Sequence, residues 1–321
     1  MEAMMNSLRL STLILMLATA NAAAQSSTPA DIESQLERAR QSIPQQTFVL
    51  QYKFTPGEAI RWTVTHQAST ETKIKGTTQT AESKTVSTKV WKVLKVDDEG
   101  RVTFVNSVEQ VNMWNKVTGR PAVSYDSSQD EEVPPVYEQA AKTVGIPLSQ
   151  VTVTNSGRIK AQKKTTQNPD MGLGQIIFPF PEEPIKIGQS WVVPNTVAVS
   201  LGEGRVKQIK IRQRYTLEKV RNSVATIRLK TETVTPVNDP RIESQLVQKL
   251  TTGEIKFDLS AGRVRSKHVE WDETVVGFSG PDSSMQYLAR FTEQLDTSRT
   301  NVAAKPSPQP APAEPIGPKL Q

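Results

Sequence analysis

Two histidines, His66 and His268, are the side chains in this sequence best suited to acid–base or metal chemistry near neutral pH. His66 lies at the end of a segment with strand-like alternation, and His268 lies near Trp271 and Asp272. Neither has a companion residue at the spacing that metal ligation requires. Both are therefore interpreted as structural or surface residues.

Carboxylates gather in two short clusters, at residues 97–99 and 130–132. Two carboxylates can act as acid and base when burial or a neighbouring charge separates their pKa values, but both clusters lie in apparent turns. Neither cluster has the ligand spacing of a calcium loop, and no serine lies in a nucleophile elbow. The chain has no cysteine, which excludes thiol catalysis and cysteine-ligated metals. We therefore expect no catalytic, metal-binding or cofactor-binding residues, and a protein that is not an enzyme.

Positive charge is concentrated in one predicted strand pair of a chain whose formal net charge is +6. The residues concerned are Arg205, Lys207, Lys210, Arg212, Arg214, Lys219 and Arg221. Lys210, Arg212 and Arg214 share one strand face, which could meet an acidic polymer or an anionic membrane surface. A solvated sheet face is the alternative. Nucleic acid is not expected, because the strip lacks interleaved aromatic residues that would stack on bases.

Four tryptophans, Trp62, Trp91, Trp191 and Trp271, fall on predicted strands. A curved sheet lined by such residues can hold an apolar ligand, so they are the candidate lining of a ligand cavity. Ordinary core packing is the alternative interpretation.

The elements that position these residues are mainly strands. Segments 48–54, 60–64 and 209–217 alternate apolar and polar residues, which is the period of a strand with one buried face. Three short helices are expected at 28–43, 135–145 and 239–253, each bounded by proline, glycine or a capping residue. Gly100, Gly157 and Gly262 are expected in turns.

The middle of the chain carries a faint internal repeat. Residues 57–64 resemble 188–193, the strand pair at 90–105 resembles 215–227, one helix follows in each copy, and the Gly-Arg turn at 151–159 resembles 255–264. The alternative is that any β-meander gives similar turns. The predicted fold is mainly β within the α+β class: an antiparallel, strongly twisted sheet that forms a barrel or two half-barrels by internal duplication, with a few short helices.

The beginning of the chain resembles a secretory signal, with Arg9, an apolar run at residues 10–17 and small residues up to Ala24. No later stretch is apolar enough to cross a membrane. The expected segments are a signal peptide (1–24), an N-terminal helix (25–46), β-rich repeat A (47–165), an apolar junction (166–184), β-rich repeat B (185–297) and a disordered proline-rich tail (298–321). We expect an exported protein, periplasmic or extracellular.

Two motifs carry a resemblance that covers roughly residues 48–295. They are Lys53-Phe54-Thr55-Pro56-Gly57-Glu58 and Pro184-Ile185-Lys186-Ile187-Gly188-Gln189-Ser190-Trp191. With the Gly-Arg turns, they make the chain similar to a planctomycete-type family of exported bacterial proteins of unknown function. These motifs imply structural turns and no activity. A weaker, fold-level likeness is to LolA-type periplasmic lipoprotein carriers, whose curved sheet holds acyl chains.

Two functional hypotheses follow. The first is an exported, non-enzymatic envelope protein that binds an apolar or amphipathic, lipid-like ligand in a curved sheet. The second is a structural or adhesive protein whose basic face binds acidic polysaccharide or an anionic membrane surface. The sequence leaves the oligomeric state open.

Overall fold

A computed structural model describes residues 46–165 and 177–298 of the chain. The predicted signal peptide and the helix at 28–43 lie outside the described residues. So do all but the first residue of the proline-rich tail and most of the apolar junction.

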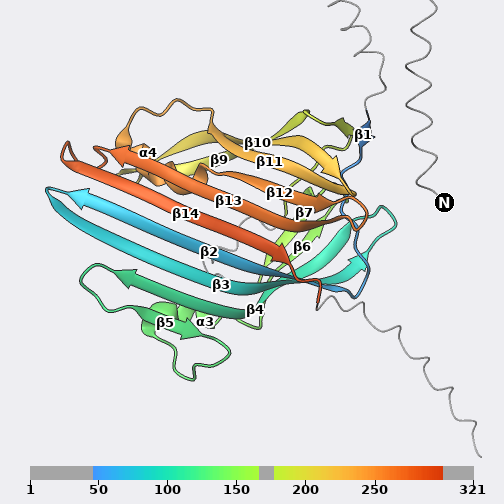
Figure 1. The fold of residues 1–321 in the computed structure, drawn as a ribbon, viewed down its shortest axis with the longest axis horizontal. Helices are drawn as coiled ribbons and strands as arrows, with labels where there is room; N and C mark the ends of the chain where they lie inside the picture. Colours follow the sequence, from blue (N-terminus) through green and yellow to red (C-terminus); the bar gives the residue numbers. More distant parts are fainter. Residues whose placement is uncertain (1–45, 166–176, 299–321) are drawn as a thin grey trace, which may run out of the picture. The chain divides into compact units, whose positions relative to one another are not determined.

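One antiparallel sheet contains nearly all of the described strands (Figure 1). Its members are β2 (Ala59–Ile74), β3 (Thr77–Val96), β4 (Val102–Val117), β5 (Val123–Asp126), β6 (Pro147–Val153), β7 (Ile159–Lys164), β9 (Ser190–Gly202), β10 (Arg205–Arg221), β11 (Val224–Thr233), β12 (Thr252–Asp258), β13 (Arg263–Val276) and β14 (Ser283–Leu295). The order is β7-β6-β4-β3-β2-β14-β13-β12-β11-β10-β9, with β5 paired to β4. A separate short pair joins β1 (Thr47–Phe48) to β8 (Ile185–Lys186).

The predicted mainly β, antiparallel class is confirmed, but the sheet does not close into a barrel. The halves of the chain meet in its centre, where β14 pairs with β2 from Ser283↔Ile74 to Leu295↔Trp62. The free edges are β7 and β9. Strand β7 is short, fully exposed and rich in lysine, and β9 carries Pro194 in its interior. Both features oppose edge-to-edge pairing, so of the two predicted alternatives, a barrel or two half-barrels, the closed barrel is not the one observed.

The two halves of the sheet have matching strand orders. From one edge, β7-β6-β4-β3-β2 is followed, after β14, by β13-β12-β11-β10-β9. Trp62 and Trp191 lie on the first long strand of their respective halves. Two tandem copies would produce this order, although the duplication itself stays a prediction.

The core lies on one face of the sheet, called the inner face here. Inward residues alternate along each strand: on β10, Ile209, Ile211, Tyr215 and Leu217 are all at most 4% exposed. Val151 on β6 and Tyr215 on β10 belong to the same buried cluster although they lie near opposite ends of the strand order. The sheet therefore curls until its two end regions share one core.

The segment predicted as a strand at 48–54 forms strand pairs only at Thr47–Phe48. Tyr52 is buried, as the alternation predicted, but its amide donates to Asn155 O and the Lys53 amide donates to Gly262 O. Both acceptors belong to the Gly-Arg turns. A Cβ on Gly157 would lie 2.6 Å from Phe178 O, and one on Gly262 would lie 2.5 Å from Lys53 N. The turns therefore need glycine for close packing as well as for positive φ.

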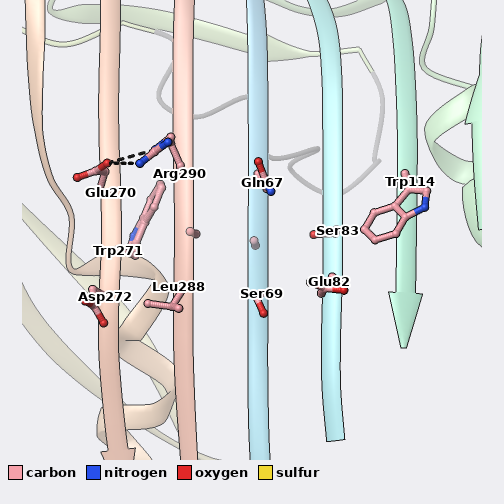
Figure 2. A pocket seen from close by; sticks show the side chains of 12 residues that line it. Gln67, Ser69, Glu82, Ser83, Trp114, Glu270, Trp271, Asp272, Leu288 and Arg290 are labelled. Carbon is pink, nitrogen blue, oxygen red and sulfur yellow. Dashed lines mark hydrogen bonds and ion pairs between the residues drawn. The ribbon is translucent and has the colours of Figure 1, made fainter. Parts of the chain in front are cut away.

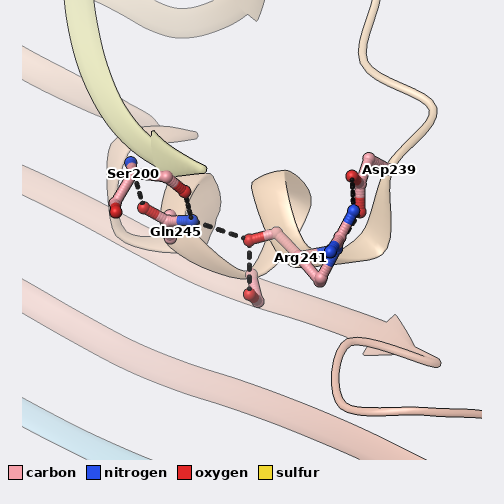
Figure 3. A network of polar contacts seen from close by, with 5 residues as sticks. Ser200, Asp239, Arg241 and Gln245 are labelled. Atoms are coloured by element: carbon pink, nitrogen blue, oxygen red, sulfur yellow. Dashed lines mark hydrogen bonds and ion pairs between the residues drawn. The ribbon is translucent and has the colours of Figure 1, made fainter. Parts of the chain in front are cut away.

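Two of the three predicted helical regions fall within the described residues, and both contain helix. The first consists of the 3-10 turn η2 (Pro135–Tyr137) and α3 (Glu138–Ala141). The second consists of α4 (Pro240–Leu246) and η3 (Val247–Lys249). Asp239 caps α4 through Arg241 N, as expected from its side chain and the following proline. Figure 3 shows that the Gln245 amide bonds both backbone groups of Ser200, which attaches α4 to β9.

Candidate functional site

The four predicted cavity tryptophans lie in three different places. Trp62 and Trp91 are buried with ring centroids 4.6 Å apart, and the Trp62 indole N–H donates to Val264 O. The Trp191 indole donates to Pro179 O, and that of Trp271 donates to Gln248 O. The structure therefore brings together only one pair of the four.

The interior beside this pair is too small for an apolar ligand. A cavity of about 10 Å³, called the inner cavity here, is lined by Tyr52, Phe54, Trp62, Trp91, Ile177, Phe178, Arg263, Val264, Lys267 and Glu293. Sites for small organic ligands have volumes of about 300–1,000 Å³. Trp62 and Trp91 act as core residues here.

A larger groove, called the seam groove here, lies beside the free edge β9. Its volume is about 590 Å³. It is lined by Arg158, Pro179, Phe180, Pro181, Glu182, Glu183, Trp191, Val192, Val193 and Pro194. Residues 179–183, within the described part of the predicted apolar junction, form one wall. Phe180 N donates to Ser156 O beside β7, and Trp191 on β9 donates to Pro179 O, so this segment connects the two edge regions.

The seam groove is apolar at its base and charged at its rim. Phe180 is 1% exposed, and Trp191 and Val193 are partly buried against the main core. Arg158 and Glu182 form an exposed ion pair with 3.4 Å between Arg158 Nε and Glu182 Oε1. Such an arrangement suits an amphipathic molecule with an apolar chain and a polar end.

A second hollow, of about 530 Å³, lies across five neighbouring strands (Figure 2). It is lined by Gln67, Ala68, Ser69, Glu82, Ser83, Trp114, Glu270, Trp271, Asp272, Leu288, Ala289 and Arg290. Glu270 Oε1 lies 3.1 Å from Arg290 Nη2 and 3.0 Å from His268 Nε2. Hydrogen bonds from His268 and Arg290 lower the pKa of the Glu270 carboxyl. The hollow is open and is lined by the charged side chains of Glu82, Glu270, Asp272 and Arg290, so it offers a weaker case for an apolar ligand.

The predicted basic face lies on β10, opposite the core face. Arg212 Nε is 2.7 Å from Glu232 Oε2, and Arg214 Nε is 3.5 Å from Glu232 Oε1. The hydrogen bond from Arg212 is the main cause of the lowered pKa of Glu232. Lys210 is exposed. One carboxylate thus offsets part of the positive charge, and binding of an anionic partner at this face stays a prediction.

The structure contains a buried ionic cluster that was not predicted from the sequence. It is formed by Lys89, Lys267 and Glu293. Their exposed fractions are 1%, 9% and 6%. Lys89 Nζ lies 2.7 Å from Glu293 Oε1, and it lies 5.2 Å and 5.4 Å from the ring centroids of Trp62 and Trp91. The sequence does contain a sign of this cluster, because Lys89 occupies an inward position on a strand face whose neighbouring residues are buried.

Desolvation controls the protonation of these inner-face groups. Burial lowers the pKa of Lys267 to about 8, the charge of Glu293 opposes the shift, and that of Lys89 adds to it. Burial also raises the pKa of Tyr52 well above its ordinary value. His66, which packs against Trp271 and Phe291, has a pKa lowered by burial.

The described residues offer no group of three or more histidine, cysteine or acidic side chains that could hold a metal ion. Asp97 lies in the β3–β4 turn, where its carboxylate accepts hydrogen bonds from Glu99 N and from Arg101. Asp130 belongs to an exposed loop and accepts a bond from Asp126 N. In the same part of the chain, no helix is long and apolar enough to span a membrane.

Comparison with solved structures finds remote likenesses, among them the following two. Lipovitellin, in a structure concerned with its lipid–protein interactions, is 13% identical with a TM-score of 0.42, and the alignment covers 79% of this chain but only 26% of lipovitellin. DynF from the dynemicin biosynthesis pathway of Micromonospora chersina is 8% identical with a TM-score of 0.20, covering 79% of this chain and 85% of DynF. Both scores are below 0.5, so no fold or ligand is inferred from them.

No curated protein matches the sequence. Residues 161–264 match a family of unknown function, DUF6263, so a likeness to a family of unknown function is confirmed for this part of the chain, while the planctomycete-type origin and the internal repeat stay predictions.

Proposed function

We propose that the protein is an exported, non-enzymatic protein of the cell envelope that binds one amphipathic, lipid-like molecule in the seam groove. The proposal rests on the difference in volume between the inner cavity and the seam groove. The interior at Trp62 and Trp91 has room for about 10 Å³, whereas the groove at Trp191 has about 590 Å³ and an apolar base. The apolar chain would lie along Phe180, Trp191 and Val193, with its polar end near Arg158.

The remaining parts of the proposal rest on the sequence. Export rests on the leader-like residues 1–24, and the absence of a catalytic role rests on the lack of a nucleophile, acid–base or metal motif. The seam groove supports a non-catalytic role. Its charged side chains are an arginine and two glutamates at the rim, and Arg158 already pairs with Glu182.

Titration with a brominated stearic acid tests the proposal, because bromine quenches the fluorescence of a tryptophan that it contacts. The wild-type chain should show saturable quenching. Val193→Glu places a carboxylate against the apolar base and should weaken binding about tenfold or more, since burying an unpaired charge is costly. Val206→Glu is the matched control: Val206 lies on β10, is 59% exposed and does not line the groove, so affinity should not change.

Trp191→Phe locates the ligand. This variant should keep its affinity, measured with radiolabelled stearic acid, and lose most of the quenching. Equal affinity of the Val193→Glu variant and the wild-type chain would refute the seam groove as the site. Undiminished quenching in Trp191→Phe would refute it as well, because the ligand would then lie beside another of the five tryptophans.

A further inference from the structure

The buried ionic cluster has an excess of positive charge. Lys89 and Lys267 face a single carboxylate, Glu293. The neighbouring Arg263 does not supply the missing anion, because its guanidinium is itself cationic and pairs with the buried Glu58 at 3.2 Å. Tyr52, next to the cluster, is held neutral by its raised pKa. A lone positive charge inside a protein is costly unless an anion accompanies it or the group loses its proton.

Two side chains in the same place have donors left over among the described residues. Lys89 has Glu293 Oε1 at 2.7 Å as partner for one of its three N–H groups, and the indole N–H of Trp91 has no acceptor. Lys267, which is more than nine-tenths buried, has neither a hydrogen bond nor an ion pair within the described part of the chain and lies 5.4 Å from the Phe291 ring centroid. Buried donors without partners usually indicate an ion or a water at the site.

The space for such a partner is present. The inner cavity is lined by Trp62, Trp91, Lys267 and Glu293, and Lys89 lies behind this lining, beside Trp62, Trp91 and Glu293. Its volume of about 10 Å³ leaves room for a single atom-sized occupant, a water or a monatomic ion. Sulfate, phosphate and carboxylate ligands are too large for it.

We propose that the inner cavity is a binding site for one small monatomic anion, of which chloride is the physiological representative. The ammonium group of Lys267 and the indole N–H of Trp91, both of which line the cavity, would provide its donors, and the ammonium of Lys89 would add a nearby positive charge. One bound anion would balance two lysines against Glu293 and give partners to the orphaned donors. The lowered pKa of Lys267 is the state of the site without this anion, because a negative charge beside the ammonium would favour its protonated form.

Thermal unfolding in sodium chloride, sodium bromide and sodium gluconate at equal ionic strength tests the proposal. Gluconate cannot enter the inner cavity, so chloride and bromide should raise Tm by about 3 °C relative to gluconate, as expected for a ligand bound only by the folded state. Lys267→Met should lose this difference. Lys256→Met removes an exposed lysine paired with Glu254 and should keep it, which controls for general salt effects.

Anomalous diffraction from crystals soaked in bromide gives a second readout that does not depend on stability. A bromide peak inside the cavity, within contact of Lys267 Nζ, together with the halide-specific rise in Tm, is the expected result. Two outcomes overturn the proposal: a cavity that contains a water and no bromide, or a bromide peak without any halide effect on Tm, which would mean binding at crystal concentration only. Halide stabilisation that persists in Lys267→Met would also overturn it.

Discussion

Replacement of Lys267 by methionine should stabilise the protein near neutral pH. Methionine has a similar length and no charge, so the substitution keeps the packing against Phe291 and removes the desolvated ammonium. Lys89 and Glu293 remain as a balanced pair at 2.7 Å. Replacing a buried charge by an apolar group of similar volume is often neutral or stabilising.

The magnitude follows from the pKa of Lys267, which falls from 10.5 to about 8 on folding. A difference of 2.5 pKa units corresponds to about 3 kcal/mol, at about 1.4 kcal/mol per unit. The unfolded chain binds more protons between these two values, so the free energy of unfolding of the wild-type chain rises with pH across this window. Below about pH 8 the lysine is charged in both states and the full penalty applies.

Urea unfolding followed by tryptophan fluorescence, in gluconate buffers from about pH 7 to about pH 11, measures the effect. Subtracting the free energy of unfolding of the wild-type chain from that of Lys267→Met cancels the contributions of the other lysines and tyrosines that titrate in this range. The difference in the free energy of unfolding should be about 2–3 kcal/mol in favour of the variant near pH 7 and should shrink towards zero above pH 10.5. Lys256→Met, at an exposed position, should show no such trend.

A difference that stays constant across the pH range would refute this reasoning, because the penalty would then not come from the charge of Lys267. A variant less stable than wild type near pH 7 would refute it too. That result would mean that Lys267 is needed to pair with Glu293, and that desolvation is not the dominant influence on its pKa.

Other substitutions have clear expected outcomes. Glu293→Gln leaves two buried lysines without a carboxylate and should lower the free energy of unfolding by about 3–5 kcal/mol in urea titrations; a loss below 1 kcal/mol would contradict the assigned burial. Gly157→Ala and Gly262→Ala should each lower Tm far more than Gly119→Ala, since all three glycines have positive φ but a Cβ at Gly119 meets open space. Equal shifts would show that the close contacts are unimportant. Asp239→Ala should cost about 1 kcal/mol in urea unfolding by removing the cap of α4, and an unchanged midpoint would mean that α4 does not depend on it.

Local features of this fold could be predicted from the sequence because they depend on residues that are neighbours along the chain. Alternation identified the inward residues of β10, and the aspartate–proline pair at Asp239 marked the start of α4. Whether the sheet closes into a barrel could not be predicted in the same way. It depends on whether β7 and β9 pair, and the lysines of β7 and Pro194 of β9 oppose that pairing.

The sites required information that local patterns do not contain. The seam groove combines Arg158, Phe180 and Trp191, which come from a turn, an irregular segment and an edge strand. The ionic cluster joins Lys89 to Glu293, two residues 204 positions apart (293 − 89) that come together because β14 pairs with β2, the neighbour of β3. Sequence periodicity places each of them on an inner face but cannot say which charge lies opposite which.

The packing of residues 50–54 argues that the two halves fold as one body. The turn at Gly157 receives the Tyr52 amide at Asn155 O, and the turn at Gly262 receives the Lys53 amide at its own carbonyl. Adjacent residues of one segment therefore satisfy equivalent turns in both halves of the sheet. A fragment that contained only one half would leave a turn without its partner and Tyr52 without the Phe178 carbonyl to which its hydroxyl donates. The shared segment, together with the thirteen-residue register between β2 and β14, makes independent folding of either half unfavourable.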